Sequence, residues 1–394
     1  MLPQGDHPSD ERTWLEIDLG ALMHNVGVMR RVVGPEVRIL AVVKADGYGH
    51  GAVQAARAAL AAGAARLGVA SCAEGEELRD AGIRVPVQVL GVLLPGEIDR
   101  AVALELIPTV HDLAGVEAFE RAAAAQHKKA PVHLKIDTGM GRLGILPGGH
   151  ESSAPGMAAP QAVAAARAVH EAAHLQLEGA FMHFPDAADR EGSAAQLSRF
   201  EAACADIRAA GVPIPLCHAA ASAATMHLPQ AHLDMVRLGI CLYGAHEDPE
   251  ALNTMGLRNV MRWLARVALV KDYPAGHPLG YGSTYTTTRP TRIAVLPVGY
   301  ADGYRRMLGN QAHALVCGRR VPVVGRVSMD YTLVDVTGVP GVRVGSVATL
   351  VGRDGAHEIR IADLSLLTRT IPDETVTQPG RRVARRYIGM DEVD

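Results

Sequence analysis

The sequence lacks any block of basic residues, and its charges nearly balance. Its 39 Lys and Arg against 42 Asp and Glu give a formal net charge of −3. This balance offers no electrostatic attraction for nucleic acid or for an anionic membrane. The chain has only five cysteines, without the paired spacing of metal or redox motifs, which predicts free thiols, no metal site and a reducing cytoplasm. No apolar run is long enough to span a bilayer, and residues 1–12 lack an apolar signal-peptide core, so we expect a cytoplasmic protein without nucleic-acid or membrane partners.

At 394 residues the chain is long for a single hydrophobic core, so we expect two domains. Its composition, 48% hydrophobic and 21% charged, is that of an ordinary globular protein. The pattern predicts a disordered lead-in over 1–12, a first domain over 13–257 and a second domain over 258–394. Residues 13–17 form a short extended piece that could pair with the second domain.

Strand-like and helix-like segments alternate through the first domain. Eight strands with intervening helices give the count and order of a (β/α)8 barrel of the TIM type, although a doubly wound sheet produces the same local pattern. The predicted strands are residues 38–43, 67–70, 87–90, 107–110, 131–136, 177–182, 214–218 and 235–240. The alanine-rich predicted helices include residues 52–62, 73–81, 113–126, 161–173 and 194–210.

The pattern changes near residue 258. From 263 to 350 short strands follow one another, separated by turns rich in proline and glycine, and one helical pattern follows at 361–370. This pattern predicts a C-terminal all-β domain after the N-terminal barrel, and hence an α/β protein with two different domains. A low-complexity segment at 148–160 is expected to be an exposed loop.

One candidate for chemistry stands at the end of the first predicted barrel strand. The β-branched run at 37–43 leads into Lys44, and the sequence continues Lys-Ala-Asp-Gly-Tyr-Gly-His-Gly, whose glycines predict a tight turn. An amine held at the end of a buried strand is partly desolvated, which favours its neutral form and Schiff-base chemistry. The same pattern also fits an ordinary strand-end lysine whose amine reaches water.

Another candidate segment, Lys-Ile-Asp-Thr-Gly-Met-Gly-Arg-Leu-Gly at 135–144, ends a later predicted strand. Its last six residues match the G-x-G-x-x-G spacing of dinucleotide-binding loops. That fingerprint requires a helix opening at Gly144 and a second strand ending in an acid about twenty residues further on. Neither follows here, because Pro147 and two glycines come at once, so we reject a dinucleotide site.

The ends of the last two predicted barrel strands suggest a phosphate site. Barrels often bind phosphate with these loops and a short helix N-terminus. Here Ser222 could donate its hydroxyl, and Gly239 and Ile240 could offer backbone N–H groups. A serine before an alanine run is also a common helix N-cap, so the pattern alone leaves both interpretations open.

The segment Ala-Val-Val-Lys-Ala-Asp-Gly-Tyr-Gly-His-Gly around Lys44 resembles the signature of the alanine racemases, enzymes that carry pyridoxal phosphate on this lysine. The resemblance extends to Tyr387 and includes further motifs in matching order, such as Val-Gly-Tyr-Ala-Asp-Gly at 298–303 and Gly-Arg-Val-Ser-Met-Asp at 325–330. It implies that Arg142 bonds the cofactor ring hydroxyl and helps to hold the substrate. Lys135 would be carbamylated, and the resulting anion would fix Arg142.

The resemblance also assigns the residues of proton transfer. Arg237 would face the pyridine nitrogen of the cofactor, and because arginine keeps its proton, that nitrogen would stay unprotonated. A weaker electron sink suppresses transamination, whereas decarboxylases of this architecture place an acid there. Tyr281, exposed between two glycines, would be the second acid/base beside Lys44, and His183 would bridge Arg237 and this tyrosine. From the pattern alone, Tyr281 also fits an exposed turn and His183 a core histidine.

The remaining assignments from the resemblance concern binding and assembly. Tyr48 and Tyr387 would bind the cofactor phosphate, Tyr300 would line the substrate entrance, and the backbone N–H of Met329 would meet the substrate carboxylate. In the family Tyr281, Tyr300 and Met329 act on the lysine of a partner subunit, which implies an obligate homodimer with shared sites.

The resemblance therefore implies an isomerase that interconverts L-alanine and D-alanine with two bases, Lys44 and Tyr281, and supplies D-alanine for peptidoglycan. A racemase of serine or of broader specificity stays open, because Ala221 stands where the family motif carries asparagine. A barrel-type pyridoxal phosphate decarboxylase is disfavoured by Arg237. A non-catalytic carrier of the cofactor is disfavoured by the whole second domain.

Overall fold

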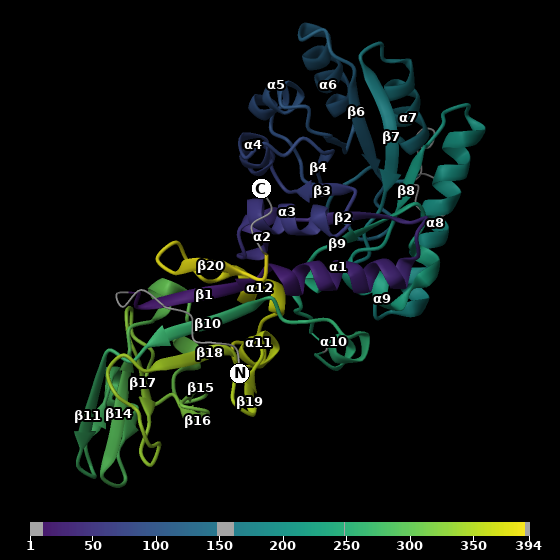
Figure 1. Cartoon of the computed structure of the whole chain (residues 1–394). Helices are drawn as coiled ribbons and strands as arrows, with labels where there is room; N and C mark the ends of the chain where they lie inside the picture. Colours follow the sequence, from purple (N-terminus) through teal and green to yellow (C-terminus); the bar gives the residue numbers. More distant parts are fainter. Residues whose placement is uncertain (1–10, 148–160, 248, 391–394) are drawn as a thin grey trace. The chain divides into compact units, whose positions relative to one another are not determined.

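The computed structural model describes residues 11–147, 161–247 and 249–390. They form two compact units (Figure 1). The barrel unit comprises Val26–Gly47 and the described part of Ala55–Leu242, and the β-rich unit comprises 11–25, Tyr48–Gln54 and the described residues from 243 to 390. Most of the expected lead-in and the expected loop at 148–160 lie outside the described residues. Across the described ranges, no helix has both the length and the apolarity to cross a membrane.

The barrel unit contains eight parallel strands in two four-stranded sheets, ordered β4-β3-β2-β9 and β5-β6-β7-β8. Parallel bridges from Gln88 to Ile107 and from Ala221 to Arg237 join the sheets at both edges, so the ring of strands closes. The closed ring confirms the predicted (β/α)8 barrel and excludes a doubly wound sheet, whose edges stay open. The strands are β2 (Arg38–Val42), β3 (Arg66–Val69), β4 (Val87–Val89), β5 (Thr109–Val110), β6 (Ala130–Lys135), β7 (Leu175–Phe181), β8 (Leu216–His218) and β9 (Met235–Leu238).

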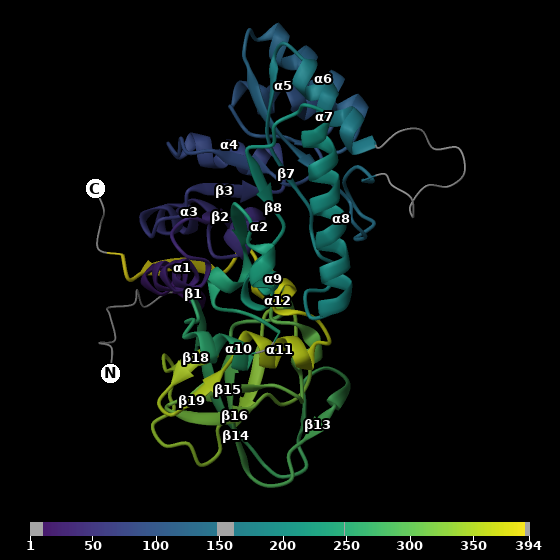
Figure 2. The same ribbon diagram turned by 90° about the vertical axis from the view of Figure 1, so that its right-hand side faces the viewer.

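The barrel strands are almost continuously buried because helices cover their outer faces. Helix α7 packs against β6, β7 and the neighbouring α8 (Figure 2). The structure also contains α5 and α9, which the alanine-rich pattern does not mark. The helices up to residue 242 are α1 (Leu19–Val33), α2 (Lys44–Tyr48), α3 (Ala52–Ala61), α4 (Cys72–Asp80), α5 (Pro95–Ala103), α6 (Leu113–Ala125), α7 (Gln161–Glu171), α8 (Arg190–Ala209) and α9 (Ser222–His227).

The β-rich unit is built on a sheet ordered β16-β15-β18-β10-β1-β20, with β19 paired to β18. Strand β1 (Thr13–Asp18) lies antiparallel to β10 and parallel to β20, so strands near the two ends of the described chain are neighbours. Two smaller sheets, β11-β14-β17 and β12-β13, complete the strands of this unit within the described residues. The other strands are β10 (Met261–Arg266), β11 (Leu269–Tyr273), β12 (Pro278–Leu279), β13 (Tyr285–Thr286), β14 (Thr291–Leu296), β15 (His313–Val316), β16 (Arg319–Pro322), β17 (Thr332–Asp335), β18 (Val347–Asp354), β19 (His357–Ile359) and β20 (Ala384–Ile388). Its helices α10 (Pro249–Met255), α11 (Ile361–Leu367) and α12 (Pro372–Thr377) are short.

Candidate active site

Lys44 follows β2 almost directly, at the strand end that the sequence predicts, and begins a left-handed turn of the backbone. Ala45, Asp46 and Gly47 have φ from 53° to 58° and ψ from 45° to 51°. Tyr48 also has a positive φ, 53°. Left-handed backbone costs about 1–2 kcal/mol for each residue with a Cβ. The sequence suggests a turn made by its glycines, but Ala45, Asp46 and Tyr48 also adopt the left-handed conformation. These three residues need other contacts to stabilise them.

That support comes from Glu74 at the start of α4. Its Oε1 accepts a hydrogen bond of 2.8 Å from the backbone N–H of Ala45, and its Oε2 accepts one of 2.6 Å from the N–H of Ala70. Ser71 at the N-cap of α4 accepts a hydrogen bond of 3.3 Å from the N–H of Glu74. One carboxylate thus joins the segments that follow β2 and β3, and it stabilises the turn that follows Lys44.

Arg237 of β9 is buried and hydrogen-bonded through both terminal nitrogens. Its Nη1 donates to Nδ1 of His218 at 3.0 Å and to the carbonyl of His218 at 3.1 Å. Its Nη2 donates to the carbonyls of Met182 at 2.8 Å and Ala219 at 2.9 Å, and it lies 3.3 Å from Nδ1 of His183. These partners fix the guanidinium at the carboxyl ends of β7, β8 and β9, the barrel face on which active sites occur.

The electrostatics of this cluster define which groups carry protons. Burial lowers the pKa of Arg237 to about 9, which leaves the guanidinium charged at neutral pH. Burial and the positive charges of Arg237 and Lys135 lower the pKa of His183 to about 3, so its imidazole is neutral. Because arginine can only donate, Nδ1 of His183 is the acceptor and its proton is on Nε2.

Lys135 ends β6 and is 4% exposed. Burial, followed by the charges of Arg237 and Arg142, lowers the pKa of Lys135 to about 8. The loop that leads to Arg142 is shaped by Asp137, whose Oδ1 accepts three backbone N–H groups at 3.0, 2.9 and 3.1 Å. No helix opens at Gly144 in the described part of this loop, so the structural context of a dinucleotide site is missing there.

The predicted phosphate-binding residues lie together in the barrel unit. Ser222 begins α9 after β8, and its Oγ accepts hydrogen bonds from the N–H groups of Gly239 at 3.0 Å and Cys241 at 3.4 Å. Neither bond uses the hydroxyl proton of Ser222, which can be donated to an incoming oxygen. Ile240 follows Gly239 in the chain, and Ala221 occupies the N-cap of α9 without a side-chain hydrogen bond.

Tyr48 and Tyr387 both lie in the β-rich unit. The ring of Tyr48 packs against Tyr243, with 5.0 Å between the centroids. Gly51, three residues after Tyr48, has φ +95°, and a Cβ there would lie 2.0 Å from the hydroxyl oxygen of Tyr387. The glycine therefore permits the hydroxyl of Tyr387 to approach the turn that contains Tyr48.

Tyr281, Tyr300 and Met329 are 70%, 43% and 52% exposed. Their segments are adjacent, because the backbone N–H of Tyr300 donates to the carbonyl of Ser328 at 3.1 Å. The glycine after Tyr281 lies against Arg326, whose Nη1 would be 3.3 Å from an added Cβ. These three predicted residues are thus exposed and lie on neighbouring segments of the β-rich unit, which we call the exposed patch.

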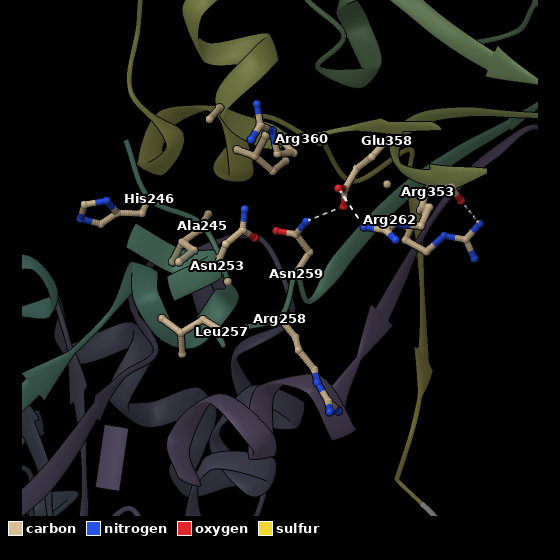
Figure 3. Close-up of a pocket in the computed structure, with 15 residues that line it drawn as sticks. Ala245, His246, Asn253, Leu257, Arg258, Asn259, Arg262, Arg353, Glu358 and Arg360 are labelled. Atoms are coloured by element: carbon tan, nitrogen blue, oxygen red, sulfur yellow. Dashed lines mark hydrogen bonds and ion pairs between the residues drawn. The ribbon is translucent and has the colours of Figure 1, made fainter. Parts of the chain in front are cut away.

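An open pocket of about 340 Å³ lies elsewhere in the β-rich unit (Figure 3). Its lining residues come from 244–262 and 352–362, and Asn259 donates a hydrogen bond of 3.3 Å to Glu358 across it. None of the predicted site residues lines this pocket, so it is separate from the candidate active site.

Sequence reasoning did not identify several residues that contact the candidate site. Glu74 holds the turn after Lys44, and His218 holds Arg237. The pattern Ser-x-x-Glu at 71–74 is a capping-box signal that marks the start of α4, but it carries no information about the bond to Ala45. His218 is the last residue of the predicted strand at 214–218, and a position at a strand end is the one feature of the sequence that could have marked it as a site residue.

Residues 17–247 match the family described as alanine racemase, N-terminal domain, and residues 260–387 match alanine racemase, C-terminal domain. An alanine racemase of Desulfosudis oleivorans is 44% identical over 384 residues, covering 96% of this chain and 97% of that protein.

Solved structures agree over nearly the whole chain. The alanine racemase of Streptomyces lavendulae superposes with a TM-score of 0.90 at 36% identity, covering 98% of both chains. That of Bacillus anthracis with bound L-Ala-P gives 0.86 at 32% identity, covering 98% of this chain and 97% of that one. That of Bartonella henselae with covalently bound pyridoxal phosphate gives 0.83 at 27% identity, covering 96% and 100%. The resemblance of the motifs is thereby confirmed, and this chain belongs to the alanine racemase family of isomerases.

Proposed function

We propose that this protein interconverts L-alanine and D-alanine in the cytoplasm, with pyridoxal phosphate held on Lys44, and supplies D-alanine for peptidoglycan. The observation that carries the proposal is the environment of Arg237. A buried guanidinium is fixed by three backbone carbonyls and two imidazoles. It would take the place that an acid holds in a barrel-type decarboxylase. The decarboxylase alternative has no support from this arrangement.

The donor set fits this cofactor. The hydroxyl of Ser222 keeps its proton available, and Ile240 follows Gly239 at the end of β9, so the Ser222 hydroxyl and the Ile240 N–H would hold the phosphate. The N–H of Gly239, predicted for the same role, donates to Ser222 Oγ at 3.0 Å in this structure and would have to share that bond with the phosphate. The hydroxyls of Tyr48 and Tyr387 would add two further donors to it. When bound, the cofactor withdraws electrons from the substrate and makes the proton on its Cα acidic.

Arg237 would face the ring nitrogen of the cofactor as a donor that keeps its own proton. Arginine holds that proton at physiological pH, so Arg237 would leave the ring nitrogen unprotonated and electron withdrawal would stay moderate. Moderate withdrawal favours return of the proton to Cα over transamination. The residue therefore matches racemisation better than the other reactions of this cofactor.

Two proton-transfer groups are needed, one on each face of Cα. Lys44 would serve one face, and Tyr281 of a second copy of the chain would serve the other. His183 presents an Nε2–H donor, because its Nδ1 accepts from Arg237. A bond from this N–H to the phenol oxygen would stabilise the ionised tyrosine and allow it to act as a base.

The exposed patch of Tyr281, Tyr300 and Met329 supports the proposed homodimer. Large side chains that are 43% to 70% exposed on neighbouring segments are typical of an interaction surface. Two further exposed side chains, Met307 at 47% and Tyr331 at 46%, belong to the same region of the chain. A second copy that covers this patch would bring three of the predicted residues to its own Lys44.

Substrate selection would depend on the same residues. The backbone N–H of Met329 and the guanidinium of Arg142 would hold the substrate, and the tyrosine rings of Tyr281, Tyr300 and Tyr387 would leave room for a small side chain. A racemase of serine or of broader specificity is the second candidate, because Ala221 leaves the N-cap of α9 without a side-chain bond.

The protein bound to pyridoxal phosphate should convert L-alanine to D-alanine faster than it converts serine or lysine, as measured by chiral chromatography. Lys44→Ala should lose both the visible absorbance of the lysine-bound cofactor and the activity. Lys129→Ala, at an exposed position, should keep both. A colourless protein that takes up no cofactor would refute the proposal.

A further inference from the structure

A chain of five polar side chains crosses the interior of the barrel unit from Arg237 to Arg66. Nη1 of Arg237 lies 3.0 Å from Nδ1 of His218, and Nε2 of His218 lies 2.9 Å from Nδ1 of His133. Nε2 of His133 lies 3.1 Å from Oε2 of Glu178. Both carboxylate oxygens of Glu178 accept hydrogen bonds from Arg66, at 2.8 and 2.7 Å.

Arg237 and Glu178, on either side of the two histidines, determine which imidazole nitrogens carry a proton. Arg237 can only donate, so Nδ1 of His218 is unprotonated and Nε2 carries the proton. That N–H donates to Nδ1 of His133, whose proton must then be on Nε2. The Nε2–H of His133 donates to Glu178, which as a carboxylate can only accept. The hydrogen bonds from Arg237 to Glu178 therefore all run in one direction, and Arg66 donates to Glu178 from the opposite end.

Burial restricts the cluster to this one arrangement of protons. His133 and His218 are fully buried and Arg237 is 4% exposed, so water does not compete for their hydrogen bonds. Burial lowers the pKa of both imidazoles, which keeps them neutral and limits each to one proton. Burial by itself raises the pKa of Glu178, but hydrogen bonds from His133 and Arg66 lower it to about 2 and keep the carboxylate ionised.

The rings are also held by packing. Phe181 stacks on His218 with 4.8 Å between the centroids and an interplanar angle of 8°. Gly179 leaves the space for His133, because an added Cβ there would lie 2.7 Å from its Cε1 and 2.7 Å from the carbonyl oxygen of Leu216. The two imidazoles therefore have little freedom to turn away from the chain.

We propose that Glu178 is a positioning residue for Arg237: it fixes the tautomers of His133 and His218 and thereby presents an acceptor to the guanidinium. The consequence for catalysis rests on the proposed function, whereas the tautomers do not. Glu178 is the fourth residue of β7, and Arg237 contacts the carbonyl of Met182, which follows the last residue of that strand and lies roughly 13 Å from Glu178 along the backbone. Glu178 therefore acts on Arg237 from a position distant from the predicted reaction face.

The substitution Glu178→Gln tests the direction of the hydrogen bonds between Arg237 and residue 178. Arg66 can only donate, so the glutamine oxygen should turn to Arg66 and its NH2 group should face His133. His133 and then His218 would have to reverse their tautomers, and an N–H of His218 would oppose the N–H of Arg237. Arg66→Met combined with Glu178→Gln removes this constraint, because the glutamine oxygen can then accept from His133.

Nitrogen-15 NMR of the histidines, recorded on the full chain with and without pyridoxal phosphate, reads the tautomers directly. We expect protonated Nε2 at both rings in the parent and in the double variant, and a reversed or mixed state in Glu178→Gln. Racemase activity should fall roughly 10–100-fold in the single variant, the range typical when an outer partner of a functional group is lost, and should recover in the double variant.

Glu120→Gln is the matched control, because Glu120 bonds His174 at 2.8 Å in the same unit without any link among the hydrogen bonds above to Arg237. It should change neither the two tautomers nor the activity. Unchanged tautomers in Glu178→Gln would overturn the proposal, and so would a double variant as impaired as the single one. If the parent shows the expected tautomers but does not racemise alanine, the proposed function fails and the tautomer assignment stands.

Discussion

The carboxylate of Glu74 accepts a hydrogen bond of 2.8 Å from the backbone N–H of Ala45, the residue that follows Lys44. Its other oxygen accepts the N–H of Ala70 at 2.6 Å. Three non-glycine residues in the left-handed turn after β2 cost roughly 3–6 kcal/mol in total. Strain of this kind persists only where surrounding contacts hold it, and it is common at functional sites. Glu74 provides such a contact, because it bonds the residue that follows the proposed cofactor lysine.

Replacement of Glu74 by glutamine should therefore destabilise the protein. An amide has a single acceptor oxygen, so one of the two backbone N–H groups loses its partner. Because the bond to Ala45 is exposed and water can replace it, the expected cost is about 0.5–1.5 kcal/mol. Urea unfolding should show this loss, and cofactor binding to Lys44 should weaken with it. Glu77→Gln on the same helix is the control, since Glu77 is exposed. Equal losses of stability in the two variants would contradict the role of Glu74.

Gly51→Ala should displace Tyr387 as well as strain the backbone. The added Cβ would lie 2.0 Å from the tyrosine hydroxyl, and φ is +95°. Gly63→Ala is a matched control, because Gly63 has φ +98° and nothing within 4 Å of its Cβ position. Both variants should lose about 1–2 kcal/mol from backbone strain, and Gly51→Ala should lose more and bind pyridoxal phosphate less tightly. Similar cofactor affinities would show that Tyr387 does not depend on this glycine.

The sequence predicted those parts of the site that depend on local patterns. Lys44 and Arg237 lie near strand ends and Ser222 begins the helix after β8, and these places follow from the alternation of strands and helices. The glycines after Lys44 predicted a tight turn, but its left-handed conformation at Ala45, Asp46 and Tyr48 had no such signal, because these residues are not glycines. The contacts of His133 and Glu178 also had none, since they join strands whose register is set by the whole barrel. Chemistry at strand ends is thus more predictable than the contacts that hold it in place.

Tyr281→Phe should retain the cofactor and lose proton exchange preferentially in one direction. The phenol hydroxyl serves one face of Cα in the proposed mechanism, whereas Lys44 serves the other and is unaffected. Deuterium incorporation from solvent, started from L-alanine and from D-alanine, measures the two directions separately. Tyr273→Phe in β11 is the control and should leave both rates unchanged. Equal residual rates in Tyr281→Phe would remove this tyrosine from the mechanism.

Acid should destabilise the protein through its buried histidines. The pKa of His183 falls to about 3 on folding, from an ordinary value of 6.5, so the unfolded chain binds more protons between these values. The free energy of unfolding then rises with pH in this window and is lost as the pH falls, by at most about 1.4 kcal/mol per pH unit for one histidine. Urea unfolding between pH 7 and 4 should show a shallower slope for His183→Asn. The exposed His357→Asn should leave the slope unchanged, and a steeper or equal slope for His183→Asn would contradict this origin.

Lys135 should carry a carbamate. Its pKa of about 8 leaves a fraction of the amine neutral at pH 7, and that amine can attack carbon dioxide and release a proton to water. The product replaces a buried cation by an anion beside Arg237 and Arg142, which removes the repulsion that lowers the pKa of the lysine. Protein equilibrated with 13C-bicarbonate should show one slowly exchanging carbamate carbon by NMR. Lys135→Gln should lack this signal and Lys128→Gln should keep it, because Lys128 instead donates to two backbone carbonyls at 3.2 and 2.8 Å. A spectrum of the parent without such a carbon would leave Lys135 as an amine, and Arg142 would then face a cation instead of an acceptor.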